Sequence, residues 1–139
     1  MSMFLSNLKI EALSPDEVHN AGSGVQLYRL LEDFSYLSDV LGVTVTAPAG
    51  MITDFASIPR AVWDFMDPED PIILFPSVIH DYLCRQYGGD GAKGDASGYH
   101  FSGHQAAQVL AEAMAVCGAS AIKRGLVYDA VARFGPQWD

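Results

Sequence analysis

The sequence predicts an α+β domain in which antiparallel strands in the N-terminal half are followed by about three packed helices. Segments with strand character come before residue 60, and the clearest of them, 43–47, alternates Thr with apolar residues at a period of two. After residue 77, apolar residues recur at helical spacing in three segments. Strands that precede helices along one chain are typical of α+β domains.

Length and charge limit the possible functions. The chain has 139 residues, half of them hydrophobic, which is enough for one domain, 1–139, with a buried core. Its formal net charge of −9 argues against non-specific binding to nucleic acid or to an anionic membrane. The longest apolar run, 71–76, is too short to cross a bilayer, and no signal peptide is expected at the start. Cys84 and Cys117 form no CxxC motif, so a reducing compartment is expected.

The strands and the helices are each bounded by recognisable turn and cap residues. We expect strands at 4–10, 24–31, 43–47 and 51–55, a connection at 35–42 and a short helix at 59–65. We expect longer helices at 77–87, from a Ser102–Gln105 capping box to Gly118, and from Ser120 to Gly135. In the first of these helices, Asp81 and Arg85 are spaced to pair on the surface. The last helix should bury a face formed by Ile122, Leu126, Ala130, Val131 and Phe134. The segment 88–103 contains six glycines and is expected to be a surface loop.

Two short segments place ionisable residues directly against apolar ones. Asp54 lies between Ile52 and Phe55, and the pair His80 and Asp81 is enclosed by apolar residues in the same way. Carboxylates and imidazoles enter such surroundings at low cost only when they are paired, hydrogen-bonded or metal-bound. The pattern therefore predicts one shared polar site in or beside the core.

This site has a catalytic and a structural interpretation. Asp54, His80 and His104 would provide three ligands for a divalent metal such as zinc with an open fourth position, and Asp81 would act as general base. Alternatively, Asp54 caps a turn, His80 is a hydrogen-bonded core histidine and His104 is solvated. His80 and Cys84 lie four residues apart on the expected helix and would form a thiol–imidazole pair only if their side chains meet.

The motifs Thr53-Asp54-Phe55-Ala56-Ser57-Ile58-Pro59-Arg60 and His80-Asp81-Tyr82-Leu83, with a later Ala-rich helix that ends in Glu112-Ala113-Met114, resemble a known family. The family is the phage- and prophage-encoded domain of unknown function 1353, and the similarity covers about residues 43–134. The chain departs from the family pattern at two positions, Cys84 in place of Tyr and Ala107 in place of Asp. His104, one turn before Ala107, would substitute for the missing carboxylate. Alternatively, the site has decayed and only the scaffold persists.

The resemblance implies a protein encoded by a tailed bacteriophage. We expect a component of the virion, in the tail, baseplate or capsid, that contacts other phage proteins or further copies of itself. Trp63 and Trp138 are expected to be exposed anchors of that contact. The chain would then be found in the virion or in the infected host cytoplasm. The alternative function is a metal-dependent hydrolase of peptide, amide or cell-wall bonds.

Overall fold

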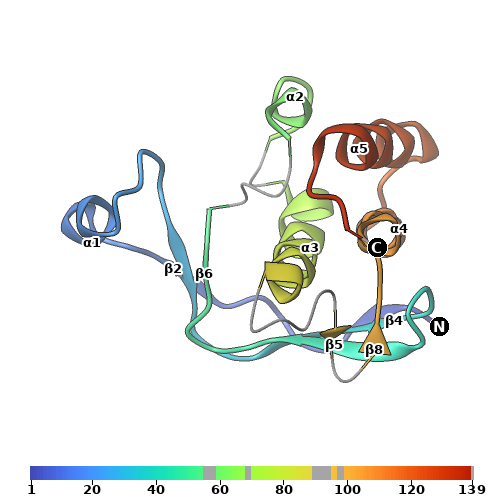
Figure 1. The fold of residues 1–139 in the computed structure, drawn as a ribbon, viewed down its shortest axis with the longest axis horizontal. Coiled ribbons are helices and arrows are strands. Elements are labelled where there is room, and N and C mark those ends of the chain that lie inside the picture. Colours follow the sequence, from blue (N-terminus) through green and yellow to red (C-terminus); the bar gives the residue numbers. More distant parts are fainter. Residues whose placement is uncertain (55–58, 68–69, 89–94, 97–98, 139) are drawn as a thin grey trace.

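The computed structural model describes residues 1–54, 59–67, 70–88, 95–96 and 99–138, and it confirms the α+β class. Strands of the N-terminal half form two antiparallel sheets, and the longer helices lie on one side of them (Figure 1). The described strands are β1 (Met3–Phe4), β2 (Ile10–Ala12), β3 (Tyr28–Leu30), β4 (Phe34–Ser38), β5 (Val43–Ala47), β6 (Ile52–Thr53), β7 (Asp95–Ala96) and β8 (Tyr99–His100). The described helices are α1 (Pro15–Asn20), α2 (Arg60–Trp63), α3 (Pro71–Gly88), α4 (Gly103–Val116) and α5 (Ala121–Phe134).

Strands β1 to β6 form two three-stranded antiparallel sheets that meet at a bend. One half of this arrangement is the sheet with the order β1-β4-β5, and the other half is the sheet with the order β2-β3-β6. Backbone hydrogen bonds continue across the bend, from Leu31 N to the carbonyl of Lys9 at 2.9 Å and from Gly50 N to the carbonyl of Leu30 at 2.8 Å. Gly50 has a φ of +88°, which a residue with a side chain rarely adopts. The bend places the helices in the angle between the two halves (Figure 1).

Several expected strand boundaries are wrong, and the expected strand 24–31 is shortened to β3 at Tyr28–Leu30. The expected strand 4–10 is divided at the bend into β1 and the start of β2. The expected connection 35–42 contains most of β4, whose residues Phe34, Tyr36 and Ser38 alternate as buried positions. The strand was missed because Ser38 is polar, although its side chain is buried and bonded to α4. Part of the expected loop 88–103 is also ordered, since β7 pairs with β8.

The expected N-cap residues of α4 and α5 are confirmed, whereas the expected start of α3 is wrong. Ser102 Oγ accepts a hydrogen bond from Gln105 N at 3.1 Å and Ser102 N donates to Gln105 Oε1 at 2.9 Å, which confirms the capping box of α4. Ser120 caps α5 as expected. Helix α3 begins at Pro71 instead of residue 77, because the carboxylate of Asp70 accepts a hydrogen bond from Ile72 N at 3.1 Å. Pro76 lies inside this helix.

The core has two parts that meet at α4. In the first, α3 and α4 pack against the sheet through residues that include Phe34, Val45, Ile79, Leu83 and Val109. In the second, α2, α4 and α5 pack together through Val62, Leu110, Met114, Val127 and Val131. Over the described part of the chain, no helix is long and apolar enough to cross a membrane.

Helix α5 does not bury the face that its sequence predicts. Val131 is buried, together with Val127, which lies one turn before it. Ile122, Leu126 and Phe134 are exposed instead, with 77%, 50% and 73% of their surface accessible. Val127 and Val131, with the partly buried Tyr128 and Ala130, pack α5 on the second part of the core, and Ile122, Leu126 and Phe134 face solvent.

A helix that was not expected, α1, projects from one end of the molecule (Figure 1). We define the arm as residues 13–27, which comprise α1 and the segment that returns to β3. Ser14 and Glu17 form a reciprocal capping box, and Pro15 occupies the first position of the helix. Because Ser14, Pro15 and Glu17 are a capping-box pattern that can be read directly from the sequence, this helix was predictable.

Candidate functional site

Helix α3 carries the residues expected to form the polar site. His80 and Asp81 are 1% and 5% exposed, so the prediction of ionisable residues in the core is confirmed for this pair. Their neighbours Ile79 and Leu83 are completely buried. Several consecutive residues of α3 are buried because this helix lies between the strands and α4, with neighbours on both sides.

His80 meets Cys84, which lies one helical turn later. The Sγ atom of Cys84 is 3.7 Å from both ring nitrogens of His80. Burial lowers the pKa of His80 to about 4, because the charged imidazolium would lose its hydration. The ring is therefore neutral at neutral pH and retains one nitrogen that accepts a proton. This arrangement suits a hydrogen-bonded core histidine, and it is also the minimum that a thiol–imidazole pair requires.

Asp81 is paired with Arg85 on the same helix. Arg85 Nε lies 3.2 Å from Asp81 Oδ2, which confirms the expected pair at four-residue spacing. The contact is an ion pair and not an aligned hydrogen bond. The expectation that the pair lies on the surface is correct for Arg85 and wrong for Asp81, whose side chain is 6% exposed. A buried carboxyl group thus lies beside a half-exposed guanidinium on the same face of α3.

The three expected metal ligands are not gathered at one point. Asp54 follows β6 and is half-buried, whereas His104 lies in the first turn of α4 and is exposed. The hydroxyl of Tyr128 in α5 lies 3.1 Å from Nδ1 of His104, so this ring belongs to the contact between α4 and α5. Among the described residues, no three His, Cys, Asp or Glu side chains are placed to hold a metal ion. Residues 55–58 of the first motif lie outside the described structure.

The two tryptophans are not exposed anchors, so that expectation is wrong. Trp63 is half-buried and packs against both parts of the core. Trp138 folds back on the body, where its Nε1 donates a 2.9 Å hydrogen bond to the carbonyl of Phe101. The carbonyl of Trp138 accepts a 2.8 Å hydrogen bond from Gly103 N. The tail after α5 is thus fixed to the start of α4.

Glu112 has a role that the sequence did not reveal. Its Oε1 accepts hydrogen bonds of 2.9 Å from the hydroxyls of Tyr36 and Ser38, and its Oε2 accepts one of 3.0 Å from Val40 N. Burial, followed by the bond to Glu112, raises the pKa of Tyr36 well above its usual value. This carboxylate joins α4 to β4 and to the turn after β4. A signal was available, since polar Ser38 continues the alternation of buried positions in β4.

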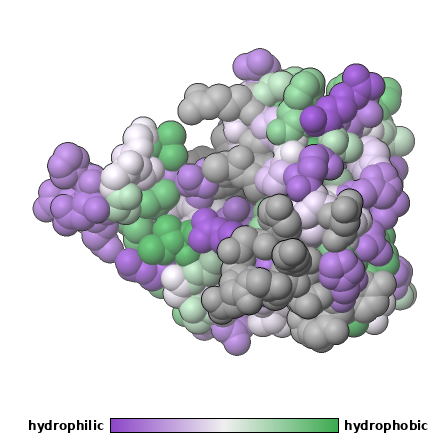
Figure 2. Space-filling model, in the orientation of Figure 1, coloured by the Kyte–Doolittle hydropathy of each residue, from purple (hydrophilic) through white to green (hydrophobic). Residues whose placement is uncertain are grey.

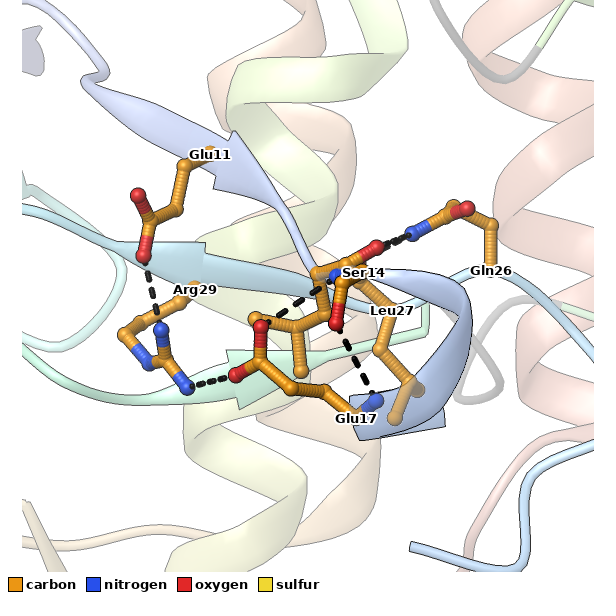
Figure 3. Close-up of polar contacts among 7 residues, drawn as sticks. Glu11, Ser14, Glu17, Gln26, Leu27 and Arg29 are labelled. Atoms are coloured by element: carbon orange, nitrogen blue, oxygen red, sulfur yellow. Dashed lines mark hydrogen bonds and ion pairs between the residues drawn. The ribbon is translucent and has the colours of Figure 1, made fainter. Parts of the chain in front are cut away.

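The arm is held by a second polar network, shown in Figure 3. Arg29 in β3 donates to Glu11 Oε1 at 2.7 Å and to Glu17 Oε2 at 2.9 Å, so one guanidinium connects two strands with α1. The hydrogen bond from Arg29 lowers the pKa of Glu17. Gln26 Nε2 donates to the carbonyls of Leu13 and Leu27, at 2.9 and 2.8 Å. The arm therefore has a defined shape although α1 buries none of its residues.

An open hollow lies on the arm, between α1 and the returning segment. It has a volume of about 340 Å³ and combines apolar and polar walls. The apolar walls are Pro15, Val18 and Val25, and the polar side chains at its edge are His19, Ser23 and Gln26. Figure 2 shows hydrophobic surface next to the hydrophilic tip of the arm.

Comparison with known proteins shows a matching family and a similar uncharacterized protein. A family model described as "Protein of unknown function (DUF1353)" matches residues 28–131. The match begins earlier than the expected limit of 43 and leaves the arm outside it. The uncharacterized protein y4jT of Sinorhizobium fredii is 31% identical over 113 residues, which are 81% of this chain and 30% of that relative. The chain thus spans less than a third of the relative's length, and no solved structure matches it.

Proposed function

The chain belongs to the DUF1353 family, and we propose that it is a component of a tailed bacteriophage particle, in the tail, baseplate or capsid, that acts through contacts with other proteins. The phage assignment rests on the resemblance of the two motifs around Asp54 and His80 to phage-encoded proteins. The mode of action rests on one structural observation, which is the projecting arm.

Helix α1 is ordered without contributing to the core, whereas the two ends of the arm, Leu13 and Leu27, are buried. Fixing a backbone segment costs roughly 1–2 kcal/mol per residue in conformational entropy, and burial of apolar surface normally offsets that cost. Helix α1 has no buried residue, and its shape depends on the capping box and on the bridge through Arg29. A segment that is held in shape yet stands away from the body is suited to contact a partner.

The alternative function, a metal-dependent hydrolase that uses Asp54, His80, Asp81 and His104, has weaker support. What favours it is the burial of His80 and Asp81, because buried ionisable groups are frequent in active sites. What disfavours it is the position of His104 against Tyr128 in the α4–α5 contact. Metal analysis of the purified protein tests it: one tightly bound zinc, manganese or iron per chain, with a higher melting temperature than the metal-stripped protein, would support the hydrolase.

The principal proposal is tested by following an epitope-tagged chain through purification of phage particles on density gradients. A matched armless variant replaces residues 13–27 with a two-residue Asn-Gly turn, which suits β2 and β3 because Ala12 and Tyr28 are direct partners in the antiparallel pair. We expect the wild-type chain in the particle band and the folded armless chain in the soluble fractions. A wild-type chain that never enters the particle band contradicts the proposal. Equal incorporation of both chains would show that the arm is not the contact element.

A further inference from the structure

The tail after α5, residues 135–138, crosses from the end of that helix to the start of α4 (Figure 1). Gly103 N donates a 2.8 Å hydrogen bond to the carbonyl of Trp138, and Trp138 Nε1 donates one of 2.9 Å to the carbonyl of Phe101. The rings of Phe101 and Trp138 meet edge to face, with their centres 5.8 Å apart. The tail therefore contacts the junction of β8 and α4 through its backbone and through a large aromatic side chain.

The other end of the tail is held on α5. The side-chain amide of Gln137 donates hydrogen bonds to the carbonyls of Ala132 and Gly135, at 2.8 and 3.1 Å. On the α4 side, a Cβ atom at residue 103 would lie 3.0 Å from Trp138 N, so glycine at this position lets the two backbones approach closely. The tail is thus a short segment with an attachment to α5 and a fitted seat on α4.

The junction that the tail holds continues into the hairpin formed by β7 and β8. Phe101, which is completely buried, directly follows β8. Asp95 pairs with His100 and Ala96 with Tyr99, and β7 contacts α3. A hairpin with two residue pairs is not stable alone, since isolated two-stranded hairpins are marginal in water. The order of β7 and β8 therefore depends on attachments such as those to α3 and to the junction under the tail.

We propose that residues 135–138 are a releasable strap. When the tail leaves Phe101 and Gly103, β7, β8 and their junction with α4 loosen as one unit, while α3, α4 and α5 stay packed together. Segments with few buried contacts open locally at a lower free energy than the core. Trp138 is only half-buried, whereas Val109 and Leu110 in the middle of α4 are completely buried, so the strap is expected to open before that helix does.

The strap connects the tail with the helix that carries His80 and Cys84. Because β7 contacts α3, a continuous series of contacts runs from Trp138 through Phe101 and the hairpin to that helix. A partner protein that takes hold of the tail would therefore change how β7 sits on α3 without touching either element. This last consequence rests on the proposed function, whereas the strap itself does not.

Residue-resolved hydrogen exchange of the whole chain tests the strap. Trp138→Ala removes the ring and the Nε1 donor, so Gly103 and the amides of β7 and β8 that are protected in the wild type should exchange about tenfold faster or more. Amides in the middle of α4 and α5 should keep their wild-type rates. Trp138→Phe retains an aromatic ring without the donor and should have an intermediate effect. Phe134→Ala is the matched control, because it removes an exposed aromatic side chain directly before the tail and should leave exchange in β7 and β8 unchanged.

Three results would overturn the inference. Wild-type exchange rates in β7 and β8 of Trp138→Ala would show that the tail does not hold the hairpin, and so would amides of β7 and β8 that are already unprotected in the wild type. Equal acceleration in every helix, with a large fall in melting temperature, would make the tail part of the global cooperative unit. If Trp138→Ala does not fold by circular dichroism, Trp138→Phe and Gln137→Ala decide the question in the same measurement. The isolated chain is used throughout, so a failed strap leaves the proposed place in phage particles intact, and a chain absent from particles leaves the strap intact.

Discussion

The carboxylate of Glu112 in α4 and the phenol of Tyr36 in β4 are joined by a 2.9 Å hydrogen bond between parts of the chain that are 76 residues apart. The same carboxylate accepts two further bonds, from Ser38 and from the backbone of Val40. One acidic side chain thus determines how the helical layer sits on the sheet. Its removal would leave the buried Tyr36 hydroxyl and two other donors without their acceptor.

Glu112→Ala is therefore expected to lower the free energy of unfolding by about 3 kcal/mol, because hydrogen bonds to a charged group contribute more than neutral ones and buried donors lose their partner. Glu112→Gln keeps one acceptor oxygen and should cost less. Urea unfolding at neutral pH measures both values. Asp129→Ala removes an exposed carboxylate from the neighbouring helix and should change the stability little. Equal effects of the Glu112 and Asp129 substitutions would contradict the role given to Glu112.

Acid should destabilise the protein through His80. The pKa of this ring falls from 6.5 to about 4 on folding, so the unfolded chain takes up a proton in this range and the folded chain does not. The corresponding stability is complete above about pH 6.5 and is lost as the pH falls to about 4, by about 3 kcal/mol.

His80→Gln should therefore have a shallower decline in stability between about pH 6.5 and about pH 4 than the wild type, measured by urea unfolding across that range. His104→Gln, which replaces an exposed histidine, provides the control for the loss of a buried one. Parallel profiles for all three proteins would show that His80 titrates normally and is not buried as described.

The position of residues 135–138, the tail after α5, should depend on residue 103 having no side chain. A Cβ atom at Gly103 would lie 3.0 Å from Trp138 N and 3.1 Å from the carbonyl oxygen of Pro136, so the backbone of the tail would have to move. Gly103→Ala should lower stability by about 1–2 kcal/mol and alter tryptophan fluorescence.

Gly125→Ala is the matched control for that substitution. A Cβ atom at Gly125 meets nothing within 4 Å, and the residue lies inside a helix. Alanine should therefore raise stability by about 0.5–1 kcal/mol. Effects of the same sign at both glycines would show that the tail is not seated on α4.

The arm should loosen locally when its bridge is removed. Arg29→Ala breaks the contacts to Glu11 and Glu17, which are partly exposed, so the melting temperature should barely change. Hydrogen exchange of the amides of α1 should become faster, because few other contacts protect them. Arg133→Ala removes a comparable surface ion pair in α5 and should leave exchange in the arm unchanged. A large fall in melting temperature, without faster local exchange, would mean that the arm is part of the cooperative core.

Local signals in the sequence predicted local structure well. The caps at Ser102 and Ser120 and the strand 43–47 appear in the structure as expected, since each depends on residues within a few positions. The four-residue spacings of His80 with Cys84 and of Asp81 with Arg85 also became real contacts. Helix geometry alone determines these pairs.

Features that depend on distant partners were predicted less well. β4 ends in the buried polar residue Ser38, whose hydroxyl donates a hydrogen bond to Glu112 in α4, a partner 74 residues away in the sequence. The expected face of α5 is buried only in part: Ala130 and Val131 pack on the second part of the core together with Val127, whereas Ile122, Leu126 and Phe134 are exposed. His104 was grouped with His80 by residue type, whereas its position in the fold places it beside Tyr128. Which side chains of a strand or helix are buried, and which residues they contact, depends on the packing of the whole chain.

The most direct test of the proposed function is the number of copies of this chain in purified phage particles, measured by quantitative mass spectrometry against known virion proteins. A component that acts through fixed contacts should be present at a constant copy number per particle, unchanged by a second round of gradient purification. A chain that falls to the level of host contaminants after the second gradient would contradict a place in the particle.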